Sequence, residues 1–197
     1  PHPWHEVSKY LGHEISRDLQ LASEITKAIT STVSVPVICK LSPLYGNVVE
    51  LTKAVKQSGA AGVTLTNRFT GFAIDIESGR PHIDGFGGIG GPWIKPITLR
   101  WIAETYLELG FPILGSNGAC DWRDSIEFMM AGAVAVQYCS AVMVHGYSRI
   151  QSIIQGVREF LQRKGYGTVE EIVGVASKSA IPYNKILQIP RQRAHIN

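Results

Sequence analysis

Short apolar runs rich in β-branched residues alternate along the chain with longer segments in which apolar residues recur every three to four positions. The apolar runs are residues 35–41, 61–67, 111–118 and 133–140. The helical pattern covers residues 14–32, 47–59, 95–110, 121–132 and 147–164. Because the runs are apolar throughout rather than alternating, each predicts a strand buried on both faces, as in a parallel sheet.

Strands that alternate with helices predict a parallel sheet with right-handed crossovers, and therefore an α/β fold. The order contains four βα units, about half of a (β/α)8 TIM barrel, which ordinarily needs ~250 residues. An open doubly wound sheet produces the same periodicity, so the pattern leaves both arrangements open. Within it, Gly59 is expected to end one helix and Asp121 to cap the start of another.

Residues 68–94 interrupt the alternation between the second strand and its helix. Their glycine content predicts a hairpin-like excursion at the C-terminal side of the sheet, where βα folds carry their ligand site. Beyond residue 164 the pattern predicts a short helix at 168–176 and then an irregular segment. We therefore divide the chain into a barrel part, residues 1–164, and a C-terminal helix and linker, residues 165–197.

The composition is that of an ordinary globular protein, and the net charge of +3 is spread along the chain. This spread argues against nucleic-acid binding, and no apolar run reaches the roughly 18–20 residues of a membrane span. Cys39, Cys120 and Cys139 fit neither a metal spacing nor a disulfide framework, which favours a reducing, cytoplasmic compartment. Because the chain begins with Pro1, we expect it to start inside a longer protein, to be processed, or to lack a segment.

Polar residues stand where the first two predicted strands end. Lys40 is either a fixed cation facing an anionic ligand atom or a lysine whose ammonium simply reaches solvent. Thr66 and Asn67 end the second strand. The carboxamide of Asn67 suits a planar, amide-containing ring, or it caps its own backbone.

Small residues precede or follow the remaining junctions. Gly87, Gly88, Gly90 and Gly91 lead into the helix that starts near Lys95, where bare backbone allows a ligand to approach closely. Their spacing is not that of a dinucleotide fingerprint, and they do not directly follow a strand. The motifs "GSNG" (115–118) and "YCSA" (138–141) follow the last two strands, where barrels commonly hold a phosphate. Cys139 is alternatively a small residue that serves only packing.

Histidines cluster near the start of the chain without a metal-site spacing. His2, His5 and His13 lie near Glu6 and Glu14, but no HExxH motif is present, and we expect no metal. Of the four tryptophans, Trp93 beside the glycines is the one placed to touch a ligand.

Taken in order, these junctions resemble the C-terminal half of the flavoproteins of the dihydroorotate and dihydropyrimidine dehydrogenase family. The resemblance covers roughly residues 1–160 and is carried by "VPVICKLSP", "GVTLTN", "GGIGGPWIKPITLR", "FPILGSNG" and "AGAVAVQYCSAV". The "QYCSAV" version and the tail "GYGTVEEIVGVA" are most similar to the bacterial NAD-dependent dihydropyrimidine dehydrogenase subunit that carries FMN and iron–sulfur clusters. In that subunit a similar tail leads into an iron–sulfur domain.

The resemblance implies a (β/α)8 barrel that holds FMN and transfers a hydride between FMN and a C–C double bond of a pyrimidine-like substrate. It places Lys40 near the flavin N1/O2 edge, and Thr66 and Asn67 beside the flavin ring and the substrate. It assigns the ribityl and phosphate contacts to Gly90, Gly91, Ser116, Asn117, Gly118, Cys139 and Ser140. Iron–sulfur clusters and NAD(P) are expected only in the complete protein or in an electron-transfer partner subunit, and relatives are commonly oligomers.

Three departures from the family pattern stand out. Arg68 replaces a small hydroxyl residue beside the substrate asparagine, which favours a larger or more anionic substrate. Asn117 replaces the first glycine of a pair, and asparagine tolerates left-handed backbone. The family's general base precedes a Pro-His pair, so "PH" at residues 1–2 places the base just before Pro1.

Two alternatives remain open besides a pyrimidine dehydrogenase. One is an FMN-binding relay subunit, or a dehydrogenase for a different anionic substrate, which Arg68 and Asn117 favour. The other is a phosphate-binding barrel or scaffold without flavin, since the glycine loop and "GSNG" would serve a sugar phosphate equally well.

Overall fold

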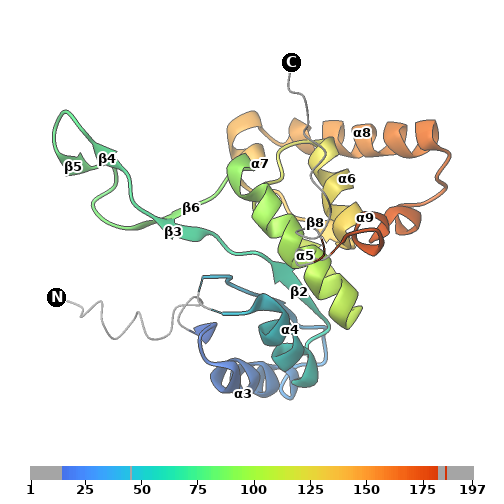
Figure 1. Cartoon of the computed structure of the whole chain (residues 1–197), viewed down its shortest axis with the longest axis horizontal. Coiled ribbons are helices and arrows are strands. Elements are labelled where there is room, and N and C mark those ends of the chain that lie inside the picture. The colour runs from blue at the N-terminus through green and yellow to red at the C-terminus, as the bar shows by residue number, and fades with distance from the viewer. Residues whose placement is uncertain (1–14, 45, 182–184, 186–197) are drawn as a thin grey trace.

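The computed structural model describes residues 15–44, 46–181 and 185. Its centre is a four-stranded parallel sheet (Figure 1). The strands are β1 (Ile38–Lys40), β2 (Gly62–Leu65), β7 (Ile113–Gly115) and β8 (Ala135–Val136), in the spatial order β1-β2-β7-β8. Each is shorter than the apolar run that predicted it.

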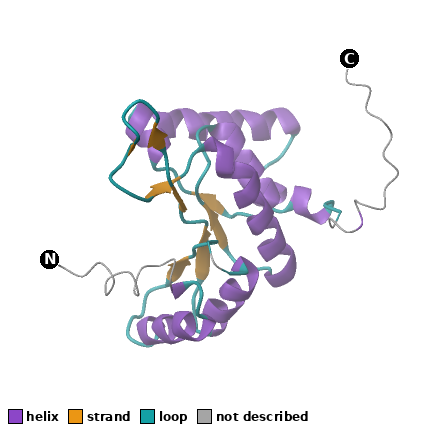
Figure 2. Ribbon diagram, turned by 60° about the vertical axis from the view of Figure 1, so that its left-hand side comes forward, coloured by secondary structure: helices purple, strands orange, loops and turns teal. Residues whose placement is uncertain are grey.

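The strand order separates the two arrangements that the periodicity left open. A doubly wound sheet reverses its strand order at a switch point, whereas a barrel adds each strand beside the previous one. Here the order follows the chain without reversal, with Cys39 opposite Val63 and Leu114 opposite both Thr64 and Ala135. The chain therefore supplies four consecutive strands of a barrel, and Figure 2 shows the helices wrapped around one side of them.

Five of the helices match the predicted ones, with shifted ends. They are α3 (Leu19–Thr30), α4 (Val48–Gln57), α5 (Lys95–Leu109), α6 (Trp122–Ala131) and α8 (Ser148–Lys164). The α3 helix begins later than predicted because the side chain of Asp18 accepts hydrogen bonds from the N–H groups of Gln20 and Leu21. Asp121 caps α6 as predicted, and Gly59, with φ +93°, follows the end of α4.

The core lies between the sheet and these helices. Val63, Leu65 and Ile113 of the strands are completely buried, as are Ile102 of α5 and Phe128 of α6. The backbone of β7 lies so close to α6 that a Cβ at Gly115 would come 2.1 Å from the Phe128 ring. Such tight packing fixes the ends of the strands, from which the site is built.

The predicted excursion at residues 68–94 is confirmed. It contains two antiparallel pairs, β3 (Phe69–Gly71) with β6 (Gly87–Ile89) and β4 (Ile74–Asp75) with β5 (Arg80–Pro81). This arm projects away from the sheet and its helices (Figure 1). A short 3-10 helix, η1 (Pro92–Ile94), then leads the chain back to α5.

Two local predictions are wrong. The run 133–140 ends in the helix α7 (Ser140–His145) rather than continuing as a strand, so Cys139 is a helix cap. The helix predicted at 168–176 is divided into η2 (Glu170–Ile172) and α9 (Val175–Lys178), because Gly174 between them adopts left-handed backbone with φ +74°.

The residues that follow α8 fold back onto the barrel helices. Ile172 is completely buried, Ser177 Oγ donates to the carbonyl of Ala131 (2.7 Å), and Gly174 N donates to that of Met129 (2.9 Å). Both η2 and α9 pack against α6, and α9 also packs against α5. The division of the chain at residue 164 stays a prediction.

Candidate functional site

A cavity of about 570 Å³ lies at the C-terminal ends of the four parallel strands. Every residue that the family resemblance assigned to cofactor or substrate lines it: Lys40, Thr66, Asn67, Arg68, Gly90, Gly91, Ser116, Asn117, Gly118, Cys139 and Ser140. These residues come from five separate segments of the chain. The fold thus brings the nominated groups to one place, while the role of each remains a prediction.

The end of β2 is joined to the end of β7 by backbone and hydroxyl contacts. Thr66 N donates to the carbonyl of Ser116 (3.1 Å), and Thr66 itself is buried. The hydroxyls of Thr66 and Thr98 lie 3.4 Å apart, and Thr98 Oγ1 donates to the carbonyl of Asn117 (3.1 Å). This network fixes the backbone from which Asn67 extends.

The carboxamide of Asn67 is partly engaged by its own segment. Its Oδ1 accepts a hydrogen bond from the N–H of Arg68 (2.8 Å), which is the backbone-capping contact that the sequence left open. Its Nδ2 has no hydrogen-bond partner within residues 15–44, 46–181 and 185. A donor of this group therefore stays available to a ligand in the cavity.

Asn117 occupies left-handed backbone, as the sequence predicted that an asparagine there could. Its φ is 73°, and its Nδ2 donates to the carbonyl of Asn67 (3.1 Å). A Cβ at Gly90 would come 2.6 Å from Asn117 Oδ1, so the glycine leaves room for this side chain. The glycine loop and the loops after β2 and β7 thus meet at Asn117.

Three consecutive N–H groups in the loop after β7 are free to bind an anion. The residues Asn117, Gly118 and Ala119 line the cavity, and in the described structure their N–H groups donate to no protein acceptor. Gly118, with φ +112°, continues the left-handed backbone that begins at Asn117. Successive N–H groups in such backbone form concave anion sites, so this loop fits a phosphate.

The cavity carries positive charge without a matching carboxylate. Lys40 and Arg68 line it, and no Asp or Glu does so among the described residues. The guanidinium of Arg68 lies against Gly88, where a Cβ would be 3.1 Å from Nε, and it forms no ion pair within the described ranges. These cations favour an anionic ligand.

Gly88, which the sequence placed in the glycine loop, also lines the cavity, whereas sequence reasoning missed Ala119, Cys120, Gln137 and Met143. Gln137 carries the clearest signal, because it is a polar residue inside an otherwise apolar run, and its Nε2 donates to Thr64 Oγ1 (3.3 Å). Met143 reaches the cavity only because α7 begins at Ser140, one turn earlier. Trp93 does not line the cavity, and its Nε1 instead donates to the carbonyl of Gly90 (2.9 Å).

Other predictions fall outside the described residues. His2, His5, His13, Glu6 and Glu14 lie there, as does the position expected for the general base. Among the residues that the structure describes, no three His, Cys, Asp or Glu side chains group as metal ligands would, and no helix is long and apolar enough to cross a bilayer.

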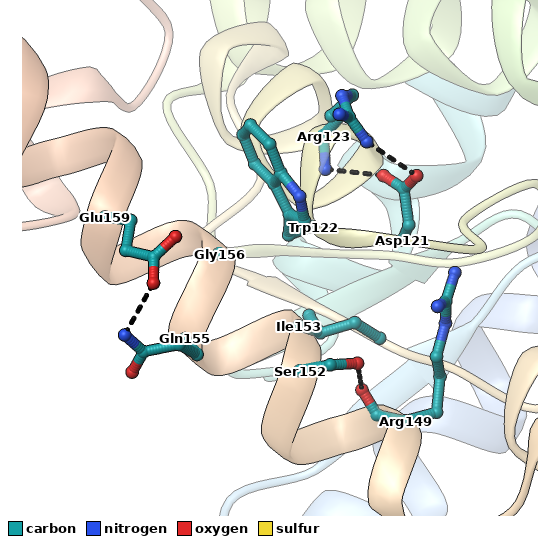
Figure 3. A pocket seen from close by; sticks show the side chains of 9 residues that line it. All are labelled: Asp121, Trp122, Arg123, Arg149, Ser152, Ile153, Gln155, Gly156 and Glu159. Atoms are coloured by element: carbon teal, nitrogen blue, oxygen red, sulfur yellow. Dashed lines mark hydrogen bonds and ion pairs between the residues drawn. The ribbon is translucent and has the colours of Figure 1, made fainter.

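A second cavity, of about 350 Å³, lies between the start of α6 and α8 (Figure 3). It contains none of the nominated residues. Arg123 contacts Asp121 here (3.3 Å), and Arg149 Nε donates to the carbonyl of Cys120 (3.1 Å). This cavity borders the loop after β7 on the side of α8.

Comparison with known proteins adds an independent observation. The sequence model of the dihydroorotate dehydrogenase family matches residues 8–161. The catalytic subunit of dihydroorotate dehydrogenase B (NAD(+)) from Pyrococcus furiosus is 38% identical over 172 residues, which are 87% of this chain and 57% of the relative. The subunits of the same name from Desulforamulus reducens and Petrotoga mobilis are 36% and 38% identical over 84% and 79% of this chain, and 54% and 52% of theirs.

The chain thus spans a little more than half the length of these relatives. All three are named as dihydroorotate dehydrogenase subunits. The comparisons therefore support the broader resemblance drawn from the sequence, while the closer resemblance to a dihydropyrimidine dehydrogenase subunit stays a prediction.

Proposed function

The chain belongs to the dihydroorotate dehydrogenase family of FMN-dependent (β/α)8 barrels, and from this premise we propose that it forms the C-terminal, FMN-holding part of such a barrel. The proposed reaction is transfer of a hydride between FMN and a C–C bond of a pyrimidine-like ring. FMN, when bound, supplies the ring that takes up or gives the hydride.

The observation that carries the proposal is the shared cavity, which combines two cations, a free carboxamide donor and three free backbone N–H groups. A sugar phosphate would use the N–H groups but would leave Lys40 and Asn67 without a role. A flat, phosphorylated ring beside a second, smaller ring uses all of them. The donor set therefore fits FMN and a heterocyclic substrate better than it fits a sugar phosphate alone.

Each lining group has a role that follows from its chemistry. Lys40 stabilises negative charge at the edge of the reduced flavin, because a preorganised cation lowers the free energy of that anion. Asn67 binds an amide edge of the substrate, and Arg68 faces an anionic substituent on it. The loop after β7, with Cys139 and Ser140, holds the phosphate end.

The proposed reaction also needs a general base and an electron acceptor. By the family resemblance, the general base lies just before Pro1. The relatives' names specify NAD(+) and a catalytic subunit. We propose by analogy that electrons pass between this FMN and NAD through a partner subunit.

The test is flavin binding followed by anaerobic reduction, with the full-length protein. FMN is titrated while its absorption and fluorescence are followed, and the complex is then mixed with dihydroorotate, dihydrouracil or dihydrothymine. We expect saturable FMN binding and bleaching of the flavin band by at least one of the three. Failure to bind FMN would reject the proposed function. Binding without bleaching by any of them would favour the relay subunit or a different anionic substrate.

A further inference from the structure

The loop of residues 116–121 is held by side chains that lie outside the FMN cavity. Asp124, in the first turn of α6, accepts hydrogen bonds at Oδ2 from the N–H groups of Cys120 (2.6 Å) and Asp121 (2.8 Å). Its Oδ1 lies 2.7 Å from Lys95 Nζ, at the start of α5. One carboxylate thus joins the loop to both helices.

Tyr138 holds the same loop from the end of β8. Its hydroxyl donates to the carbonyl of Asp121 (2.9 Å) and lies 2.5 Å from Ser125 Oγ. Arg149, a residue of α8 that lines the second cavity (Figure 3), adds a further contact. Its Nε donates to the carbonyl of Cys120. Each peptide N–H and carbonyl of residues 120 and 121 is therefore engaged, the Asp121 carbonyl also accepting from Ser125 N.

The two halves of the loop differ in their hydrogen bonding. The N–H groups of residues 120 and 121 are bound to Asp124, whereas those of residues 117–119 meet no acceptor in the described parts of the chain. We propose that Asp124 and Tyr138 are positioning residues, which fix the second half of the loop so that its first half presents free N–H groups to the cofactor phosphate. This inference rests on the proposed function, because it takes FMN as the occupant of the cavity.

The charge of Asp124 is compatible with a phosphate nearby. A lone carboxylate would repel the phosphate, but Lys95 pairs with Asp124 and also with Glu127 (2.7 Å). Burial alone would raise the pKa of Asp124, yet the hydrogen bonds from Lys95 and from the backbone outweigh burial and lower it. The carboxylate therefore stays ionised and paired around neutral pH, and Lys95 serves the loop rather than the phosphate.

The experiment compares two flavins that differ only in the phosphate. Full-length protein freed of flavin is titrated with FMN and, separately, with riboflavin, and binding is followed by quenching of flavin fluorescence. We expect Tyr138→Phe and Asp124→Asn each to weaken FMN binding about tenfold while riboflavin binding stays within about twofold. Glu104→Gln is the matched control, because it removes a carboxylate that pairs with Arg100 (2.8 Å) elsewhere on α5, and it should change neither affinity.

Four results would overturn the inference. Variants that lose FMN and riboflavin affinity equally would show a general structural role, and variants that lose neither would show no role. Wild-type protein that binds FMN and riboflavin equally would place the phosphate outside this loop and leave the proposed function standing. Wild-type protein that binds neither flavin would reject both this inference and the proposed function. Tyr138→Phe keeps the test decisive if Asp124→Asn does not fold.

Discussion

The carboxamide of Asn117 donates a hydrogen bond from Nδ2 to the backbone carbonyl of Asn67, at 3.1 Å. Fifty positions separate these residues in the chain, and each follows a different strand of the sheet. The contact forms because Asn117 adopts left-handed backbone and because residue 90 carries no Cβ. A residue of the proposed phosphate loop thereby holds the residue proposed to bind the substrate.

The first prediction concerns this contact. Asn117→Gly keeps the left-handed backbone at no steric cost but removes the hydrogen bond, so Asn67 is less well fixed. We expect the KM for the proposed pyrimidine-like substrate to rise about tenfold, with FMN affinity changed by less than about threefold. Steady-state kinetics and FMN titration of the same preparation measure both.

Gly90→Ala provides the matched test of the same contact. Its Cβ would come 2.6 Å from Asn117 Oδ1 and displace that side chain, so it should raise the KM to a similar extent. In the double variant there is no Asn117 side chain left to displace, and the effects should not add. Additive effects would show that the two residues act independently and would contradict the interpretation.

Arg68 carries the second prediction. Its guanidinium lines the cavity and forms no ion pair in the part of the chain that the structure describes. If it faces an anionic substituent, Arg68→Met should raise the KM for dihydroorotate about ten- to a hundredfold, the effect of a lost charge-assisted hydrogen bond. The KM for dihydrouracil, which has no carboxylate, should change less than about twofold. An equal change for both substrates would contradict a role in recognising charge, and Arg68→Lys should recover part of the loss.

The sequence could predict the gathering of the site because parallel strands end at one edge. Residues at strand ends, such as Lys40, Asn67 and Ser116, had to meet wherever the four strands formed one sheet. Helix capping could be predicted equally well. An Asp directly before a helical pattern accepts hydrogen bonds from the first free N–H groups of the helix, as Asp121 does.

The features that could not be predicted from the sequence depend on packing between distant segments. The apolar residues of 133–140 are compatible with either a strand or a helix. Only the structure shows that α7 starts at Ser140 and brings Met143 into the cavity. Tyr138 precedes Cys139, which the sequence assigned to the site. Its hydrogen bond to the Asp121 carbonyl depends on how β8 and α6 pack against each other. The spacing of these residues in the sequence does not predict that packing.

Alkaline unfolding provides the third prediction. Burial raises the pKa of Tyr138 to about 12, above the ordinary value of 10. The folded protein therefore keeps the phenol proton that the unfolded chain loses, and the stabilisation is complete below pH 10 and is lost as the pH rises toward 12. Tyr138→Phe lacks this dependence, so the stability advantage of the wild type over the variant should shrink across that window.

The measurement is the free energy of unfolding in urea at several pH values from 8 to 12. Tyr147→Phe is the control, because it removes the same hydroxyl from a side chain that is 87% exposed. Parallel curves for the wild type and Tyr138→Phe would contradict the prediction.

The fourth prediction tests whether the residues after α8 stabilise the barrel part. The Tyr106 ring of α5 lies directly against Gly174, where a Cβ would come 2.1 Å from the ring. Gly165 has a similar backbone, with φ +77° against +74°, but a Cβ there would meet nothing within 4 Å.

Alanine costs about 1–2 kcal/mol at either position because of the left-handed backbone. Gly174→Ala adds about 1–3 kcal/mol of overpacking against Tyr106. We expect urea unfolding to show a clearly larger loss of stability for Gly174→Ala than for Gly165→Ala. Equal losses would mean that η2 and α9 contribute little to the fold and would support a division of the chain near residue 164.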